Sequence, residues 1–251
     1  MERSLRVDAS HGPCVPEIDQ SGQYWYRFCK FSAEFILAIC LLAPAVPLIL
    51  LAALVVKLTS RGPAFYSQKR LGRDGIVFTI YKIRTMFHDC EKLTGPRWAS
   101  VADPRITPIG RFLRRTHMDE LPQLFNVLRG QMALVGPRPE RPEIVDQLEH
   151  QIPRYRDRLL VRPGLTGLAQ IQLPPDTDLA SVRRKLAHDL YYVQNLTLAI
   201  DVRILLSTAC YLARISFATS QSFCQVPAGE KVERAYRHLI GEEPALQMQS
   251  A

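Results

Sequence analysis

The longest apolar stretch of the chain lies near its N-terminus. Residues 35–56 carry no charged side chain between Glu34 and Lys57, and as a helix they are long enough to cross a bilayer core of roughly 30 Å. Pro44 and Pro47 interrupt the stretch, and each removes a hydrogen bond inside a helix. Basic residues flank both ends, which favours keeping both ends on one side of a membrane. A re-entrant helix that bends at the two prolines is therefore predicted in preference to a straight span.

The pattern after this segment predicts a small α/β domain in which helices predominate. Residues 77–84 alternate as a strand, which places Lys82 and Arg84 on the same face. Helical spacing of apolar residues predicts helices over residues 109–115, 121–128, 179–193 and 198–217. Charged residues interrupt the last of these, so it is expected to pack on the domain or lie in the membrane interface as an amphipathic helix.

Composition fits a membrane-surface protein. The net charge is +8, which suits anionic lipid or phosphorylated substrates, and no zinc-finger, RNA-binding or helix-turn-helix pattern supports nucleic acid as a partner. The cysteines lack metal-ligand spacing and are expected to be reduced. The predicted organisation is a polar tail over residues 1–23, an interfacial segment with the membrane helix over 24–58, a folded domain over 59–218 and a C-terminal tail over 219–251.

An acid pair followed by a constrained arginine carries the most specific chemical signal. Asp119 and Glu120 begin the helix predicted over 121–128, where capping and the helix dipole explain two acids about as well as chemistry does. The loop after this helix places Arg138 between two prolines, which fix the backbone on both sides of the guanidinium. An acid pair and a presented cation are suited to holding a metal-bound diphosphate and attacking it with a carboxylate.

Further basic residues are candidates for binding phosphate. Lys82 and Arg84 share a strand face, although a solvated edge strand explains them too. Arg114 lies on a basic face of the helix over 109–115, directly before the acid pair. Arg162 leads into a glycine turn whose backbone could approach a phosphate closely.

Six short motifs together resemble the bacterial sugar transferases, the monotopic phosphoglycosyl transferases of polysaccharide and glycoconjugate assembly. The motifs are Gly62-Pro63-Ala64-Phe65-Tyr66, Gln68-Lys69-Arg70-Leu71-Gly72, Tyr81-Lys82-Ile83-Arg84-Thr85-Met86, Asp119-Glu120-Leu121-Pro122-Gln123, Gly136-Pro137-Arg138-Pro139 and the segment Arg162-Pro163-Gly164-Leu165-Thr166-Gly167-Leu168-Ala169-Gln170. The resemblance covers residues 31–208, and the compact form of the family is expected, without the four-span membrane region of larger members.

The resemblance implies transfer of a sugar 1-phosphate from a UDP-sugar to undecaprenyl or another polyprenyl phosphate, with release of UMP. Asp119 matches the family's nucleophile, which forms a covalent phosphosugar intermediate, and Glu120 matches the second member of a dyad that works with Mg²⁺. Arg138 matches a substrate phosphate ligand, and Arg114, Lys82, Arg84 and Arg162 occupy similar basic positions. The implied location is the bacterial inner membrane with the catalytic domain, residues 59–218, facing the cytoplasm. Membrane lipids are expected partners, and a homo-oligomer and downstream glycosyltransferases are further candidates.

One departure and two alternatives accompany this interpretation. Val46 stands before Pro47 where the family usually has a serine, and valine cannot satisfy a carbonyl freed at a bend. Asp176-Thr177-Asp178 resembles the DxD metal motif of ordinary glycosyltransferases, although it reads more simply as a loop and helix cap. A non-catalytic membrane-anchored assembly protein is the other alternative. The sugar cannot be named from these residues.

Overall fold

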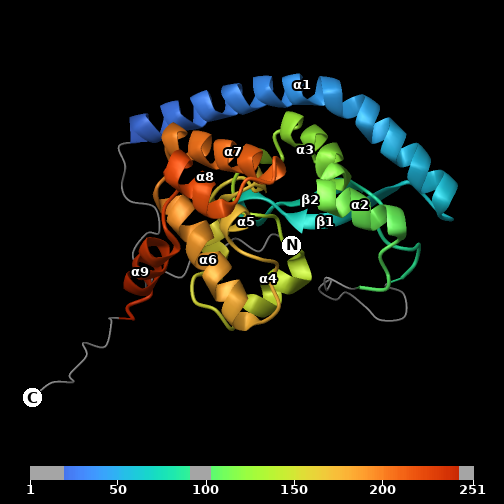
Figure 1. Ribbon diagram of the computed structural model, residues 1–251. Helices are drawn as coiled ribbons and strands as arrows, with labels where there is room; N and C mark the ends of the chain where they lie inside the picture. The colour runs from blue at the N-terminus through green and yellow to red at the C-terminus, as the bar shows by residue number, and fades with distance from the viewer. Residues whose placement is uncertain (1–19, 91–102, 243–251) are drawn as a thin grey trace, which may run out of the picture.

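One long helix dominates the computed structural model, which describes residues 20–90 and 103–242 (Figure 1). Helix α1 (Gln20–Thr59) is bowed and runs over the rest of the molecule. It continues through Pro44 and Pro47, so these prolines lie within a curved helix and not at a break between two helices. A helix tolerates the loss of single hydrogen bonds where neighbouring turns remain bonded. The re-entrant course in a membrane stays a prediction.

Helix α1 has two different apolar faces. The face toward the domain carries mostly small side chains that are buried, namely Ala38, Ala45, Ile49, Ala52 and Val56. The opposite face exposes large side chains, namely Ile36, Leu50, Leu51, Leu54 and Leu58. Among the described residues, Tyr24–Thr59 is the one helix long and apolar enough to cross a membrane. So much exposed apolar surface on one helix is typical of contact with lipid or another protein.

A β-hairpin follows α1 and lies beneath it. Strands β1 (Phe65–Leu71) and β2 (Val77–Ile83) pair antiparallel, joined by the short 3₁₀ helix η1 (Arg73–Gly75). Phe78 and Ile80 are buried in the core below α1. The strand predicted from the alternation of residues 77–84 is therefore confirmed.

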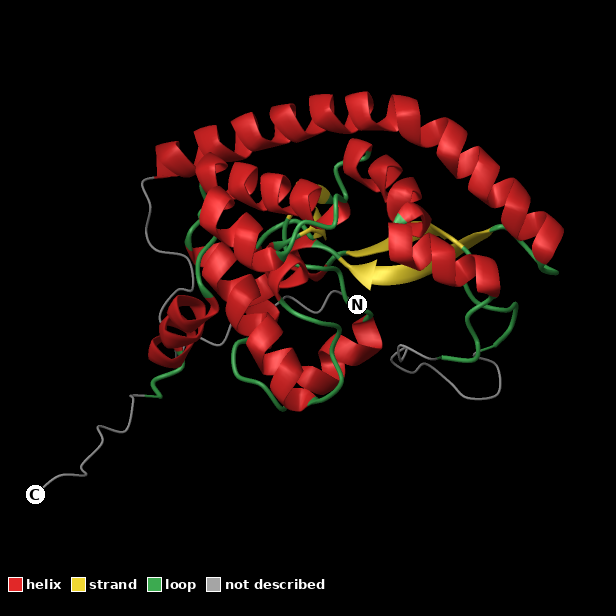
Figure 2. Ribbon diagram, in the orientation of Figure 1, coloured by secondary structure: helices red, strands yellow, loops and turns green. Residues whose placement is uncertain are grey.

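The middle of the chain forms a series of short helices and strands (Figure 2). In order they are α2 (Pro108–Thr116), the 3₁₀ helix η2 (Met118–Gln123), α3 (Leu124–Leu128), β3 (Ala133–Val135), α4 (Pro142–Leu148), the 3₁₀ helix η3 (Tyr155–Leu160), β4 (Gly164–Thr166) and α5 (Leu168–Gln172). Strands β3 and β4 pair in parallel, with Val135 opposite Thr166. The described chain is thus mostly helical with two small sheets.

Four helices complete the described fold. They are α6 (Leu179–Gln194), α7 (Leu198–Leu212), α8 (Phe217–Cys224) and α9 (Gly229–Leu239). The prediction of a tail from residue 219 is wrong for residues 219–242, because Cys224, Val226 and Val232 are buried against α6 and α7. These apolar residues do not follow the i, i+3, i+4 spacing of a helix, so the sequence pattern did not predict α8 and α9. Residues 1–19 and 243–251 of the predicted tails lie outside the described residues, and residues 20–23 belong to α1.

Candidate active site

The acid pair occupies a tight turn between two helical segments. Helix α2 begins with the Thr107 side chain accepting a hydrogen bond from the Gly110 amide at 2.9 Å and ends at His117, whose φ is 56°. This left-handed residue reverses the chain direction, so that η2 starts at once with Asp119 and Glu120 in its first turn. Asp119 is 7% exposed. The dyad therefore projects from the start of a short helix, as its sequence position predicted.

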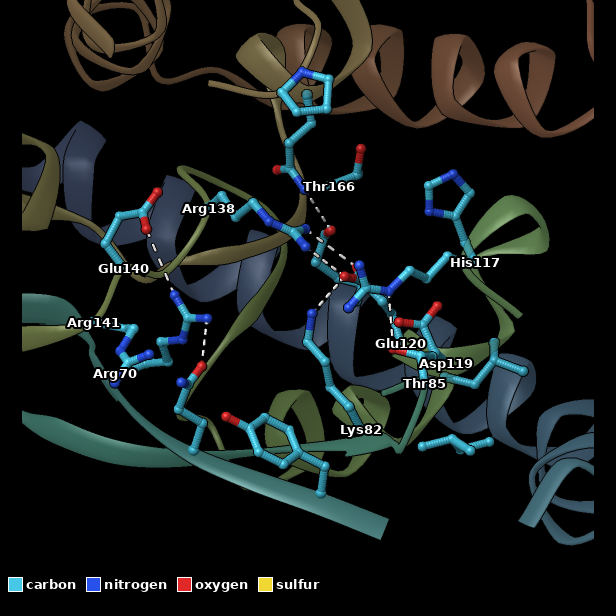
Figure 3. Close-up of a pocket in the computed structure, with 18 of the residues that line it drawn as sticks. Arg70, Lys82, Thr85, His117, Asp119, Glu120, Arg138, Glu140, Arg141 and Thr166 are labelled. Carbon is cyan, nitrogen blue, oxygen red and sulfur yellow. Dashed lines mark hydrogen bonds and ion pairs between the residues drawn. The ribbon is translucent and has the colours of Figure 1, made fainter. Parts of the chain in front are cut away.

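Glu120 is held between two cations from distant parts of the chain. Lys82 Nζ on β2 lies 2.6 Å from Glu120 Oε1, and Arg138 Nη2, from the loop after β3, lies 2.5 Å from the same oxygen (Figure 3). A second Arg138 nitrogen, Nη1, donates to Glu120 Oε2 at 3.2 Å. Burial alone would raise the pKa of Glu120, but the charges of Arg138 and Lys82 outweigh it and hold that pKa well below its usual range.

Asp119 has a different environment from its neighbour. Within the described residues, its carboxylate makes no hydrogen bond or ion pair. Burial raises the pKa of Asp119, and the adjacent Glu120 carboxylate raises it further. The charges of Lys82, Arg114 and Arg138 act against this rise without cancelling it. Asp119 is thus a buried carboxyl group near three cations, and a group with so perturbed a pKa in a cavity is a candidate for chemistry.

Arg114 reaches the site from α2. Its Nε donates to Thr85 Oγ1 at 2.9 Å, directly after strand β2, and this contact orients the guanidinium along the cavity wall. The Thr85 carbonyl in turn accepts the Thr107 amide at 3.0 Å. Gly110 lies so close that a Cβ at this position would be 2.0 Å from the Thr85 carbonyl oxygen. The start of α2 and the end of β2 therefore position Arg114 together.

The dyad lies in a cavity of about 1590 Å³ with two unlike walls. One wall is polar and carries the charged residues of the dyad and its neighbours (Figure 3). The other wall is mostly apolar and comes from α1 and α7, through Leu41, Pro44, Ala45, Leu48, Leu205, Thr208, Tyr211 and Leu212. A ligand that combines an anionic group with a long apolar chain would match both walls.

A second charged cluster at the polar wall was not predicted from the sequence. Glu140 lies 2.6 Å from Lys185, 3.6 Å from Arg70 and 3.8 Å from Arg158. Arg158 also forms a buried ion pair with Asp189 at 2.6 Å. The only signal for this cluster was the position of Glu140 directly after the motif Gly136-Pro137-Arg138-Pro139. Arg70 and Lys185 are 45 or more residues away from Glu140 along the chain, and Arg158 belongs to no motif. Spacing could not identify these partners.

Two of the expected phosphate ligands have other roles in the structure. Arg84 lines the cavity, but its guanidinium donates to the Arg61 carbonyl at 2.7 Å and the Ser60 carbonyl at 3.0 Å, which caps the end of α1. Arg162 does not line the cavity, and its guanidinium lies 4.9 Å from the Phe31 ring centroid under α1. The structure therefore gathers Lys82, Arg114 and Arg138 around the dyad, whereas the guanidinium of Arg84 bonds backbone carbonyls and that of Arg162 lies over Phe31.

The alternative metal motif is used for structure. The Asp178 side chain accepts the Ser181 amide at 2.7 Å and caps α6, and Asp176 pairs with Lys185 at 2.7 Å. Over residues 20–90 and 103–242, no group of three or more His, Cys, Asp or Glu side chains could hold a metal ion. An octahedral Mg²⁺ commonly takes one or two carboxylates and completes its shell with water and substrate phosphate. Asp119, free of partners, fits that arrangement, whereas Glu120 would have to release a cation.

The comparison with known families decides the relationship. Residues 25–214 match the family model described as "Bacterial sugar transferase". The chain belongs to this family. The sugar transferase dyad, the proline-locked arginine and the strand lysine all lie within the matched residues, so the resemblance of the short motifs is confirmed over a continuous region.

Relatives of this sugar transferase carry related names. The UDP-glucose:undecaprenyl-phosphate glucose-1-phosphate transferase of Caulobacter vibrioides is 45% identical over 177 residues, 70% of this chain and 66% of the relative. The exopolysaccharide production protein PSS of Rhizobium leguminosarum is 41% identical over 186 residues, 72% of this chain and 89% of the relative. An N-acetylgalactosaminephosphotransferase of Aeromonas hydrophila, which acts with undecaprenyl phosphate, is 40% identical over 183 residues, 73% of this chain. The alignment spans only 43% of the Aeromonas protein.

Proposed function

We propose that this protein transfers a sugar 1-phosphate from a UDP-sugar to undecaprenyl phosphate or another polyprenyl phosphate, as the initiating step of exopolysaccharide or glycoconjugate assembly. The observation that carries the proposal is the unpartnered Asp119 carboxylate, buried among Lys82, Arg114 and Arg138 in a cavity with one charged and one apolar wall. The names of the relatives support both substrates.

The reaction divides into two displacements at one phosphorus atom. An Asp119 carboxylate oxygen attacks the β-phosphorus of the UDP-sugar, the bond from that phosphorus to the bridging oxygen breaks, and UMP leaves with the bridging oxygen and its electron pair. A phosphate oxygen of the polyprenyl phosphate then attacks the same phosphorus and displaces Asp119. The products are UMP and a polyprenyl diphosphate sugar, and the carboxylate is restored without net proton transfer.

The surrounding side chains have separate roles in this scheme. Arg138 and Lys82 exchange their contacts with Glu120 for contacts with the diphosphate, and Arg114 faces the oxygens that gain charge. Glu120 keeps the two cations in place in the free protein. Mg²⁺, held by Asp119 and Glu120 together with substrate phosphate, would neutralise charge on the diphosphate and on the departing UMP.

The apolar wall supports the second substrate and the location. An isoprenoid chain from the bilayer would pass along the α1 and α7 side chains to bring its phosphate to Asp119. Helix α7 lies beside α1 in Figure 1 and exposes Val202, Leu206, Tyr211 and Leu212. We infer that α1 inserts in the bacterial inner membrane as a re-entrant helix, that α7 lies in the interface, and that the cavity opens to the cytoplasm.

The released nucleotide tests this proposal. Purified protein in detergent is mixed with Mg²⁺, undecaprenyl phosphate and a panel of UDP-sugars, and UMP and UDP are separated by chromatography. UMP with one sugar supports the proposal and names the donor, and Asp119→Asn should abolish it while Asp176→Asn, outside the dyad, retains it. UDP release would indicate an ordinary glycosyltransferase. Silence across the panel from folded protein would favour a binding or assembly role.

The covalent intermediate has its own test. Without polyprenyl phosphate, the protein should gain the mass of one phosphosugar, and proteolysis should place that mass on the peptide with Asp119. Full transfer by Asp119→Asn, or an adduct on another residue, would refute the assignment of the nucleophile.

A further inference from the structure

A buried polar network joins the N-terminal half of α1 to the catalytic domain, away from the cavity. Lys30 Nζ lies 2.8 Å from Glu34 Oε1 and 3.0 Å from Asp201 Oδ1 on α7. Asp201 also accepts hydrogen bonds from Tyr26 at 2.9 Å and from Tyr192 on α6 at 2.7 Å. Lys30, Glu34 and Asp201 are each less than 9% exposed. None of the five lines the cavity.

This network ends on the backbone of one residue, Val135. The Val135 amide donates to Glu34 Oε1 at 3.1 Å, and its carbonyl accepts from Lys30 Nζ at 3.1 Å. The Tyr192 hydroxyl lies 3.2 Å from the same carbonyl, which shares the single hydroxyl proton with Asp201. On its other side, β3 pairs with β4, for example through the Gly136 amide and the Thr166 carbonyl. Side chains of α1 and α6 thus bond the free edge of β3, as a third strand would otherwise do.

Only two residues, Gly136 and Pro137, separate Val135 from Arg138, and the connection between them is stiff. Pro137 and Pro139 fix φ on either side of the arginine. A Cβ on Gly136 would lie 2.5 Å from the Arg162 carbonyl oxygen, so the loop packs closely against its neighbour. The Pro137 carbonyl accepts the Gly164 amide at 2.8 Å. Val135 and the backbone of Arg138 are therefore expected to move together.

We propose that Glu34 and Lys30 are positioning residues for Arg138. The position of α1 on the domain then determines the position of Arg138, which pairs with Glu120. The inference rests on the proposed function for its catalytic meaning but not for its structural meaning. Buried ion pairs contribute little net stability compared with apolar packing, so the proposed role of this network is to specify how α1 and β3 are arranged. A network that ends on both polar groups of Val135 specifies the position of β3 relative to α1.

Hydrogen–deuterium exchange provides a test that does not depend on activity. Glu34→Leu removes the acceptor of the Val135 amide, and exchange in the peptide covering residues 132–141 should become about tenfold faster. Glu34→Gln keeps an acceptor oxygen at this place and should restore most of the protection. Tyr192→Phe, which removes one hydroxyl and keeps the ring, should increase exchange in the same peptide by a smaller factor. This variant replaces Glu34→Leu in the test if Glu34→Leu folds poorly.

Ile49→Ala is the matched control for general loosening of α1. Ile49 is buried on the same helix, has no polar side-chain atom that could bond Val135, and does not line the cavity. This variant should lower the melting temperature and leave exchange in the 132–141 peptide unchanged. Equal acceleration of that peptide in Ile49→Ala and Glu34→Leu would overturn the proposal, because it would show only that α1 is less firmly attached. Unchanged exchange in Glu34→Leu would overturn it as well.

Kinetics then connect the network to Arg138. In Glu34→Leu the KM for the UDP-sugar should rise about tenfold, with recovery in Glu34→Gln. Combined with Arg138→Lys, Glu34→Leu should add little to the KM, because both changes affect the same group. Additive effects, or a fall in active protein at constant KM, would refute the positioning role. If the wild-type protein transfers no sugar phosphate, the proposed function fails while the exchange experiment still judges the network.

Discussion

Replacing Glu120 by glutamine should strengthen nucleotide binding in the absence of metal while weakening catalysis. Lys82 and Arg138 are both paired with Glu120 in the free protein, so a phosphate must compete with that carboxylate for them. A carboxylate and a phosphate roughly 5 Å apart repel each other by about 3 kcal/mol at an effective dielectric constant of about 20. After allowance for screening at this partly open site, the Glu120→Gln variant should bind UDP about 10 to 100 times more tightly than the wild type in EDTA.

Calorimetric titration of UDP in EDTA measures this gain, and the UMP-release assay with Mg²⁺ measures the loss. Transfer should fall about 10 to 100 times, because Glu120 also orients the two cations and contributes to the metal site. Asp157→Asn is the control, since Asp157 pairs with Arg154 at 2.7 Å and neither residue lines the cavity. It should lower stability without changing the affinity for UDP. Equal or weaker UDP binding by folded Glu120→Gln would refute the assignment of Lys82 and Arg138 as phosphate ligands.

Three further predictions concern stability. Arg84→Met should destabilise the protein by about 1.5 to 3 kcal/mol, because its bonds to the carbonyls that follow α1 are lost. The KM for the UDP-sugar should stay within about twofold of the wild-type value. A large change in KM at an unaltered melting temperature would contradict this structural role. Burial raises the pKa of Glu140, but Lys185 and Arg158 outweigh it and lower that pKa from 4.5 to about 2. Because the folded value is the lower one, this stabilisation is present above pH 4.5 and is lost as the pH falls toward 2, by up to about 3 kcal/mol; chemical unfolding at several pH values should show this loss in the wild type, and the same pH dependence in Glu140→Gln would refute it. Gly110→Ala should destabilise the protein by about 1 to 3 kcal/mol and reduce transfer, because the added Cβ would lie 2.0 Å from the Thr85 carbonyl oxygen. Gly229→Ala is the control, because no atom lies within 4 Å of the added Cβ, and it should melt near the wild-type temperature.

Local features of the fold could be predicted from the sequence because neighbouring residues determine them. Thr107 and Asp178 cap helices as expected, and the alternation over residues 77–84 gave a strand. These assignments depend on backbone hydrogen bonds and side-chain directions within a few residues. The same reasoning placed Asp119 and Glu120 at a helix start and Lys82 on one strand face with Arg84.

The partners of the basic residues could not be predicted in this way. Arg84 was expected to share a phosphate with Lys82 because the two lie on one strand face, yet Arg84 lies beside the free carbonyls at the end of α1 and bonds them. A long guanidinium side chain binds whichever buried acceptor lies nearest, and that depends on the packing of distant elements. Arg162 illustrates the same limit, because the bowed helix α1 covers it with Phe31.

Two adjacent carboxylates acquire different chemistry because distant residues surround only one of them. Glu120 faces Lys82 and Arg138, which keep it ionised and fixed, so it is a poor nucleophile and a good organiser. Asp119 is buried without a partner, and its raised pKa corresponds to a more basic carboxylate. Such a carboxylate is the better nucleophile when the nearby cations Lys82, Arg114 and Arg138 keep it ionised. Consecutive side chains of the 3₁₀ helix η2 point about 120° apart, so Asp119 and Glu120 face different surroundings. On this argument Asp119 and Glu120 are not interchangeable. A variant with their order reversed would have its aspartate paired with Lys82 and Arg138 at position 120, and the longer glutamate at the unpaired position 119.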